Sequence, residues 1–228
     1  MAPSNGEPDI GHSFNDTNDQ YAKRPVRLIY TPLGSAKCRN GSVSKSLKLS
    51  KSRIADGLVC EKKVYLSVHK PELKAEITAS QQARFDAGNE VGELARKTFP
   101  NGILIDREYW QVEDAINDTN AAIKAGKDTI YEASFGNNDF HCRVDVLHRE
   151  STNGPWNVYE VKSGLSPKPE YILDLAIQCW ILNQCKIPWS RAHIIHINRN
   201  CRYPNLENLF VRADVTDAVN DILSDFDG

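Results

Sequence analysis

The alternation of apolar and polar residues along the chain predicts two leading helices. Apolar residues recur at helical spacing over residues 50–69 and again over residues 80–99, where Pro100 ends the pattern. The first stripe is formed by Ile54, Leu58 and Tyr65, and the second by Phe85, Val91 and Leu94. We expect both stripes to face the core.

Strand-like segments dominate the middle of the chain. The short segment 102–106 (GILID) is typical of a strand, and residues 110–126 are typical of a helix that closes at a glycine. Segments 129–135, 140–150 and 156–163 are rich in β-branched and aromatic residues. The turn GNND between the first two of these three predicts a β-hairpin.

The last third alternates again between helix and strand. Residues 169–185 form an amphipathic helical pattern with proline in its first turn, segments 191–199 and 207–215 are strand-like, and residues 216–226 are helical. No internal repeat is present. The order of elements predicts an α/β fold with a central mixed β-sheet flanked by helices.

The first 47 residues differ in composition from the rest. They are rich in Asn, Ser, Asp, Gly and Pro, which predicts a disordered tail over residues 1–47 and a folded domain over residues 48–228. Between Tyr21 and Arg53 every charged residue is basic. This stretch either holds phosphates electrostatically or is a solvated basic tail, and the second interpretation is favoured.

Overall composition excludes some classes of protein. The chain has 228 residues, 40% of them hydrophobic and 25% charged, and its net charge is −2. A nucleic-acid partner would therefore need a local basic patch. No apolar run approaches the roughly 18 residues of a membrane span, and the N-terminus lacks the apolar segment of a signal peptide, so we expect a cytoplasmic protein with no membrane contact. The six cysteines form no CxxC pair and are expected to be free thiols.

One strand-like segment carries charges where apolar residues would normally pack. In YEVKS, Glu160 and Lys162 lie two positions apart and therefore share one face of a strand. Asp145 lies on the preceding strand. If the two strands pair, Asp145 and Glu160 come close enough to bind one cation. The alternative is an exposed edge strand whose opposite charges contribute little energy.

Strand alternation also makes predictions about the neighbours of Asp145. Val144 and Val146 are expected to form the apolar-facing pair, and Arg143 to share the face of Asp145.

Two carboxylates held together cost several kcal/mol unless a proton or a metal neutralises them. Magnesium prefers oxygen ligands, keeps several waters and makes a bound water a better nucleophile. Lys162 would then orient or deprotonate that water, or neutralise the transition state.

These motifs resemble the PD-(D/E)XK nuclease superfamily. Over residues 49–212 the chain is similar to its RecB-type branch, which includes CRISPR-associated adaptation exonucleases and related bacterial domains of unassigned function. The resemblance rests on the order of LSKSRIADGLVCEKKVYL, GNEVGELARKTFPNG, RVDVL, YEVKSG and YILDLAIQCWIL. It implies a restriction-endonuclease-like core.

The resemblance also implies roles for individual residues. Asp145 and Glu160 match the metal ligands, with the backbone carbonyl of Val161 as a further ligand. Lys162 matches the catalytic lysine. Gln178 matches the glutamine that contacts DNA or the site, although a surface position at the helix margin is an equal alternative.

Several other residues are candidates for the substrate cleft. Tyr171, Arg143 and Glu132 are expected to contact substrate, although a structural role in the strand is the favoured alternative for Glu132. Trp156 near the site is a candidate for stacking on a base, with a core position as the favoured interpretation.

The chain departs from the family pattern at three places. The histidine that many RecB-type enzymes use as a metal ligand is replaced by Gly92, for which Glu93 or Glu90 would have to substitute. Leu182 stands where an aromatic residue is usual. Cys60 matches the first cysteine of an iron–sulfur cluster, but the other cysteines lack the required spacing, so we expect no cluster in this chain.

The sequence therefore predicts a deoxyribonuclease dependent on Mg²⁺ or Mn²⁺, expected to be an exonuclease in DNA repair or defence, with DNA as its partner. A nuclease-like module that binds nucleic acid or a protein partner without cutting is the alternative, motivated by Gly92. A plain interaction domain with an exposed strand edge is a third interpretation.

Overall fold

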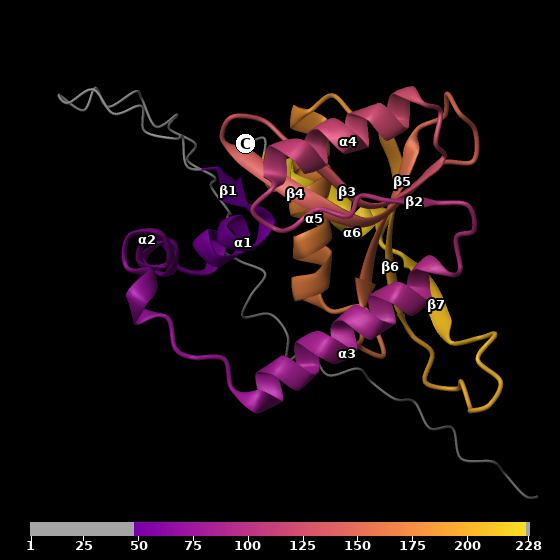
Figure 1. The fold of residues 1–228 in the computed structure, drawn as a ribbon, viewed down its shortest axis with the longest axis horizontal. Helices are drawn as coiled ribbons and strands as arrows, with labels where there is room; N and C mark the ends of the chain where they lie inside the picture. The colour runs from indigo at the N-terminus through magenta and orange to yellow at the C-terminus, as the bar shows by residue number, and fades with distance from the viewer. Residues whose placement is uncertain (1–47, 227–228) are drawn as a thin grey trace, which may run out of the picture.

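A seven-stranded mixed β-sheet flanked by helices organises the chain (Figure 1). The computed structural model describes residues 48–226, so the predicted tail lies outside the described residues. The strands are β1 (Leu49–Ser50), β2 (Ile103–Leu104), β3 (Thr129–Gly136), β4 (Phe140–His148), β5 (Trp156–Lys162), β6 (Trp189–Ile197) and β7 (Phe210–Asp214). The helices are α1 (Lys51–Val59), α2 (Glu61–His69), α3 (Ala79–Arg96), α4 (Val112–Lys124), α5 (Pro169–Gln184) and α6 (Thr216–Phe226), with a 3₁₀ turn at Pro71–Leu73.

The strand order is β2-β3-β4-β5-β6-β7, and β1 pairs with one end of β4. Strands β3, β4 and β5 form an antiparallel meander, with the GNND turn between the first two. Helix α5 connects β5 to the parallel strand β6, and β7 returns antiparallel to β6. The predicted mixed sheet with flanking helices is confirmed.

Two apolar clusters pack on the sheet. Ile130 and Val158 belong to the larger cluster, which includes the buried residues of α4, α5 and α6. Their neighbours Tyr131 and Tyr159 belong to the smaller cluster, near the end of α3. Because successive strand residues point to opposite faces, the two clusters cover opposite faces of the sheet. Within residues 48–226, no helix combines the length and the apolar content that crossing a bilayer requires.

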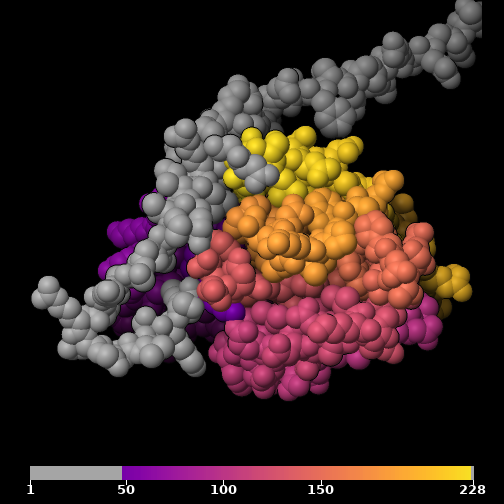
Figure 2. Space-filling view, turned by 90° about the horizontal axis from the view of Figure 1, so that it is seen from above, coloured from indigo at the N-terminus to yellow at the C-terminus, as the bar shows by residue number. Residues whose placement is uncertain are grey.

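The predicted leading helices differ from the structure in two ways. The chain is extended at Cys60, which divides the expected first helix into α1 and α2. Helix α2 buries none of its residues, so Tyr65 is exposed and does not continue the stripe begun by Ile54. In α3 only Ala95 is buried, because the helix packs on the sheet near its C-terminal end, and Phe85 is exposed. The α1–α2 segment lies at one side of the molecule in both views (Figures 1 and 2).

The meander is irregular where β3 passes Asp145. The β3–β4 pairing joins Tyr131 to Val146 and Ala133 to Val144 but omits the residues between them. The residue omitted from β3, Glu132, has a φ of 54°, in the left-handed region. Consequently Val144 packs in the larger cluster and Val146 in the smaller one. The prediction that these valines share one apolar face is wrong, because alternation is interrupted here.

Candidate functional site

Strands β4 and β5 bring Asp145 and Glu160 together where their pairing ends. The last paired residues are Val146 and Tyr159, and the same register places Asp145 opposite Glu160. Instead of continuing the ladder, the amide nitrogen of Val161 donates a 2.7 Å hydrogen bond to Asp145 Oδ2. The other end of β4 pairs with β1. The two strands therefore diverge beyond this point, and α1 begins beside the opening.

Glu160 is buried and both of its carboxylate oxygens accept hydrogen bonds. Its Oε1 lies 3.0 Å from Lys51 Nζ and 2.8 Å from Lys162 Nζ. Its Oε2 accepts a hydrogen bond of 2.5 Å from Gln178 Nε2. The exposed edge-strand interpretation is thus wrong, because Glu160 is only 3% exposed. Such a buried carboxylate requires its cations, and removing them leaves an uncompensated charge.

Gln178 lies in the core and not at a surface margin of α5. Its side chain is fully buried, and its position against Glu160 agrees with the predicted site role. The amide oxygen of Gln178 has no hydrogen-bond partner within residues 48–226. Buried polar atoms are seldom left unpaired.

Lys162 is held from two sides. Its Nζ lies 2.8 Å from Asp174 Oδ2 on α5 as well as 2.8 Å from Glu160 Oε1. The Tyr171 ring centroid lies 5.2 Å from the same ammonium group. Tyr171 therefore packs beside Lys162, and it lines neither of the two cavities described below. Its predicted position in the substrate cleft is not supported.

The two carboxyl groups titrate in opposite directions. Burial alone would raise the pKa of Glu160, but Lys51 and Lys162 outweigh it and hold that pKa well below its usual value. Burial, and then the charge of Glu160, raises the pKa of Asp145. Burial lowers the pKa of Lys162, yet Glu160 and Asp174 reverse the effect, so this lysine stays protonated. The surroundings therefore favour the ionised form of Glu160 and the neutral form of Asp145.

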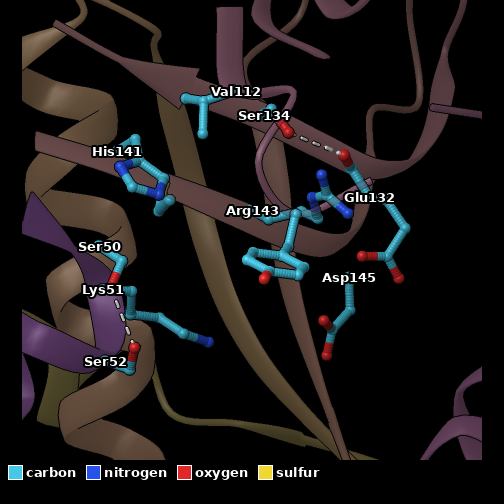
Figure 3. A pocket seen from close by; sticks show the side chains of 11 residues that line it. Ser50, Lys51, Ser52, Val112, Glu132, Ser134, His141, Arg143 and Asp145 are labelled. Carbon is cyan, nitrogen blue, oxygen red and sulfur yellow. Dashed lines mark hydrogen bonds between the residues drawn. The ribbon is translucent and has the colours of Figure 1, made fainter. Parts of the chain in front are cut away.

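Two cavities open beside this pair and share Glu132 and Asp145. The larger has a volume of about 530 Å³ and is lined by the exposed face of α3 and by Glu160 and Val161. The smaller has a volume of about 290 Å³ and is lined by the start of α1, by Tyr109 and by Arg143. In Figure 3 the Lys51 side chain points into the smaller cavity from one side, and Glu132 and Asp145 lie together on the other. Arg143 and Asp145 both border this cavity.

Glu132 has a structural role, in an ion pair, and also lies at the candidate site. Arg96 Nη2 donates a 2.8 Å hydrogen bond to its carboxylate, so the charge is paired. Its left-handed backbone costs about 1–3 kcal/mol, and such strain clusters at functional sites. The side chain borders both cavities beside Asp145.

The positions that depart from the family pattern also lie at or near the site. Gly88 and Gly92 line the larger cavity, and a Cβ atom on either would meet no other atom within 4 Å. Glu93 lines this cavity and Glu90 does not, which leaves Glu93 as the candidate substitute for the missing histidine. Leu182 is fully buried in the larger core cluster.

Trp156 is a core residue beneath Arg149, so it is not available for stacking on a base.

Side chains alone supply few potential ligands for a metal ion at this site. Among residues 48–226 no group of three or more His, Cys, Asp or Glu side chains is placed to hold a metal ion. Cys60 is exposed, and Cys179 is buried in α5.

Sequence reasoning missed two charged residues of the site, Lys51 and Asp174. Lys51 follows the N-cap Ser50, whose hydroxyl accepts a hydrogen bond from Arg53 N, so α1 begins with this ammonium group beside Glu160. No local pattern predicts its distant partner. Asp174 did leave a signal, because Asp174 and Gln178 are polar residues four apart on an otherwise apolar stretch of α5 and therefore share one helix face.

Comparisons with known proteins add little. No family model and no curated protein matches the chain. Several solved structures match, among them one titled "Crystal structure of SSO0001", which has 13% sequence identity and a TM-score of 0.27 over 72% of this chain and 81% of that one. A similarity at this level carries no argument about fold or function.

Proposed function

We propose that the chain is a metal-dependent nuclease with a restriction-endonuclease-like core that hydrolyses phosphodiester bonds of DNA. The observation that supports this most is the convergence of Asp145, Glu160 and Lys162 beside a cavity of about 530 Å³, at the point where two paired strands diverge. A buried strand face seldom carries such a group unless it has a function. Gln178 and Asp174 fix Glu160 and Lys162 from α5.

The donor atoms fit a hard divalent cation, Mg²⁺ or Mn²⁺. Magnesium is usually held by only one or two carboxylates together with waters, so a three-residue group is not required. Asp145 is a carboxyl group that burial and Glu160 keep from ionising, and a cation would reverse both effects. Asp145, Glu160 and the carbonyl oxygen of Val161 would hold the ion. When bound, it would activate a water and stabilise negative charge on the phosphate.

The protein's own groups would supply positioning and charge. Hydrolysis forms a bond between a water oxygen and phosphorus and breaks the bond to the leaving nucleotide oxygen, which takes up a proton. Lys162 is held by Glu160 and Asp174 beside the reactive carboxylates, where its positive charge would stabilise negative charge that develops on the phosphate. Arg84 and Arg96 line the same cavity and would attract the DNA backbone.

The resemblance of the sequence motifs to RecB-type nucleases supports a more specific proposal. It favours exonucleolytic cleavage of DNA in repair or in defence against foreign DNA. The resemblance identifies no protein partner.

A binding module that does not cut is the second candidate. Both oxygens of Glu160 already accept hydrogen bonds from Lys51, Lys162 and Gln178. Lys51 therefore lies where a metal ion would have to approach, and Gly92 supplies no ligand. Such a site would bind nucleic acid through its lysines without hydrolysing it.

A cleavage assay separates the two candidates. End-labelled linear DNA and circular DNA, each single- and double-stranded, are incubated with magnesium, manganese or EDTA. Cutting that requires the metal supports the nuclease, and intact circular substrates identify an exonuclease. DNA that is bound but never cut under any condition supports the binding module and overturns the proposal.

A further inference from the structure

Two exposed aromatic residues are neighbours in the loop before α4, and one of them borders the smaller cavity. Tyr109 and Trp110 are 79% and 65% exposed, and their ring centroids are 4.8 Å apart in an edge-to-face arrangement. Tyr109 lines the cavity itself. Large aromatic side chains in water are unfavourable for folding, so a pair at the tip of a loop indicates a contact surface.

The loop that carries these rings is fixed in place. Glu108 N donates to Gln111 Oε1 over 3.1 Å, and Gln111 N donates to the carbonyl oxygen of Glu108 over 3.0 Å. Arg143 on β4 also donates to the Glu108 carbonyl, over 3.4 Å. The rings are therefore presented by a closed turn tied to the wall of the cavity.

Two cationic side chains line the same cavity, although the protein has a net charge of −2. Lys51 and Arg143 line it, and Lys48 and Arg53 are near enough to His141 to affect its titration. Burial lowers the pKa of His141 first, and repulsion from Lys48, Arg53 and Arg143 lowers it further.

The acidic groups around this cavity are largely compensated. Glu113 is ion-paired with Lys48, and Glu132 with Arg96. The remaining carboxyl group, that of Asp145, accepts a hydrogen bond from Val161 N on its Oδ2. The ammonium group of Lys51 and the guanidinium group of Arg143 line the cavity and are the groups that an anion would contact.

The interior also offers unsatisfied hydrogen-bonding capacity. Nδ1 of His141 is buried and has no partner within the described part of the chain. Ser50, Ser52 and Ser134 also line this cavity, where the hydroxyls of Ser50 and Ser52 are hydrogen-bonded to each other over 3.0 Å and the hydroxyl of Ser134 donates to the carbonyl oxygen of Glu132 over 3.3 Å. A volume of about 290 Å³ is at the lower end for small-molecule pockets and suits one nucleotide, not a duplex.

An exposed aromatic ring, two cations and an unpaired imidazole nitrogen in one lining together match the recognition of unpaired nucleotides, in which bases stack on rings while phosphates contact cations. We propose that the smaller cavity binds one unpaired nucleotide of single-stranded DNA, with its base on Tyr109 and its phosphate contacted by Lys51 and Arg143.

This inference rests on the proposed function and makes it more specific, because it names the class of substrate. Because the two cavities share Glu132 and Asp145, a strand held in the smaller cavity would place its next phosphate at the reactive carboxylates. The substrate would accordingly be single-stranded, or a duplex with a frayed end.

Binding is tested on the full chain without cleavage. Fluorescein-labelled (dT)₁₂ is titrated in EDTA and followed by fluorescence anisotropy, with a blunt duplex and free dTMP as competitors. Tyr109→Ala is expected to weaken binding roughly 5- to 150-fold, the effect of losing one base-stacking contact. Arg143→Gln is expected to lower the dependence of log K on log salt by about 0.7.

Tyr65→Ala is the matched control, because Tyr65 is also exposed, also pairs with a ring (His69, 4.6 Å) and lines neither cavity. The affinity of Tyr65→Ala for (dT)₁₂ should equal that of the wild type. Equal affinity of Tyr109→Ala and wild type overturns the inference, as does competition by the duplex at the same concentration as by unlabelled (dT)₁₂. Competition by dTMP that Tyr109→Ala weakens supports it.

The cleavage assay keeps the two proposals apart. A protein that binds (dT)₁₂ through Tyr109 but cuts no DNA retains the nucleotide site and loses the nuclease function. A protein that cuts DNA while Tyr109→Ala binds and cuts normally retains the nuclease and loses the nucleotide site.

Discussion

Lys162 and Asp174 form a 2.8 Å ion pair that joins the end of β5 to the first half of α5. We expect Asp174→Asn to lower kcat about 10- to 100-fold, because groups that orient a reactive side chain typically contribute this much. KM should change little, since Asp174 lines neither cavity. Steady-state cleavage kinetics in saturating metal would measure the effect.

Asp118→Asn is the control for that variant. Asp118 also forms an ion pair, with Arg107 at 2.6 Å, but on the surface of α4. Its kcat should equal that of the wild type. If both variants have wild-type kcat, Asp174 does not position Lys162 for catalysis.

Gly92→His should supply the histidine ligand that many RecB-type enzymes have and that this chain lacks. A Cβ atom at this position meets nothing within 4 Å, and the residue lines the larger cavity with Asp145 and Glu160. The manganese concentration for half-maximal cleavage should fall about tenfold, equivalent to about 1.4 kcal/mol. Gly92→Ala fills the same helix position without a ligand and should leave the metal requirement unchanged. A histidine variant that behaves like the alanine variant would show that the position does not face the metal.

Asp145 should make the metal-free protein less stable as the pH rises. Burial and Glu160, with a smaller effect of Glu132, raise its folded pKa to about 8 against the opposing effect of Lys51, whereas the unfolded chain ionises near pH 4. The unfolded state therefore releases this proton first, and the contribution of Asp145 to stability falls between about pH 4 and pH 8.

Asp145→Asn removes this dependence and keeps an acceptor for Val161 N. In EDTA, the free energy of unfolding of the variant relative to the wild type should increase by at least about 1.4 kcal/mol between pH 5 and pH 8. Denaturant titrations at both pH values would measure it. A constant difference between the two proteins would mean that Asp145 is not desolvated as the structure indicates.

The strands and the later helices were predictable because their periodicity is strong and local. The meander from β3 to β5, with Asp145 and Glu160 on neighbouring strands, followed from alternation and one hairpin turn. Alternation failed at Glu132, where a left-handed residue interrupts the ladder. No sequence signal marks that position, since glutamate is not a residue that favours positive φ.

The other features of the candidate site depend on contacts between residues that are far apart in the sequence. Lys51 reaches Glu160 across 109 positions of sequence, and nothing near Lys51 specifies that partner. Phe85 continues an apolar stripe that the sequence assigns to the core, yet it borders the larger cavity. Periodicity shows which face of a helix is apolar, but not whether the fold covers that face.

The most direct test of the central claim is single-turnover cleavage of linear DNA by the wild type and by Lys162→Met in Mn²⁺. Methionine keeps much of the volume of lysine and removes its charge, and unfolding curves of both proteins verify that the fold is retained. The account predicts cleavage by the wild type that EDTA abolishes, and a rate at least about 10³-fold lower for Lys162→Met. Equal rates for the two proteins, or cleavage that persists in EDTA, would contradict the assignment of Asp145, Glu160 and Lys162 as the reactive centre.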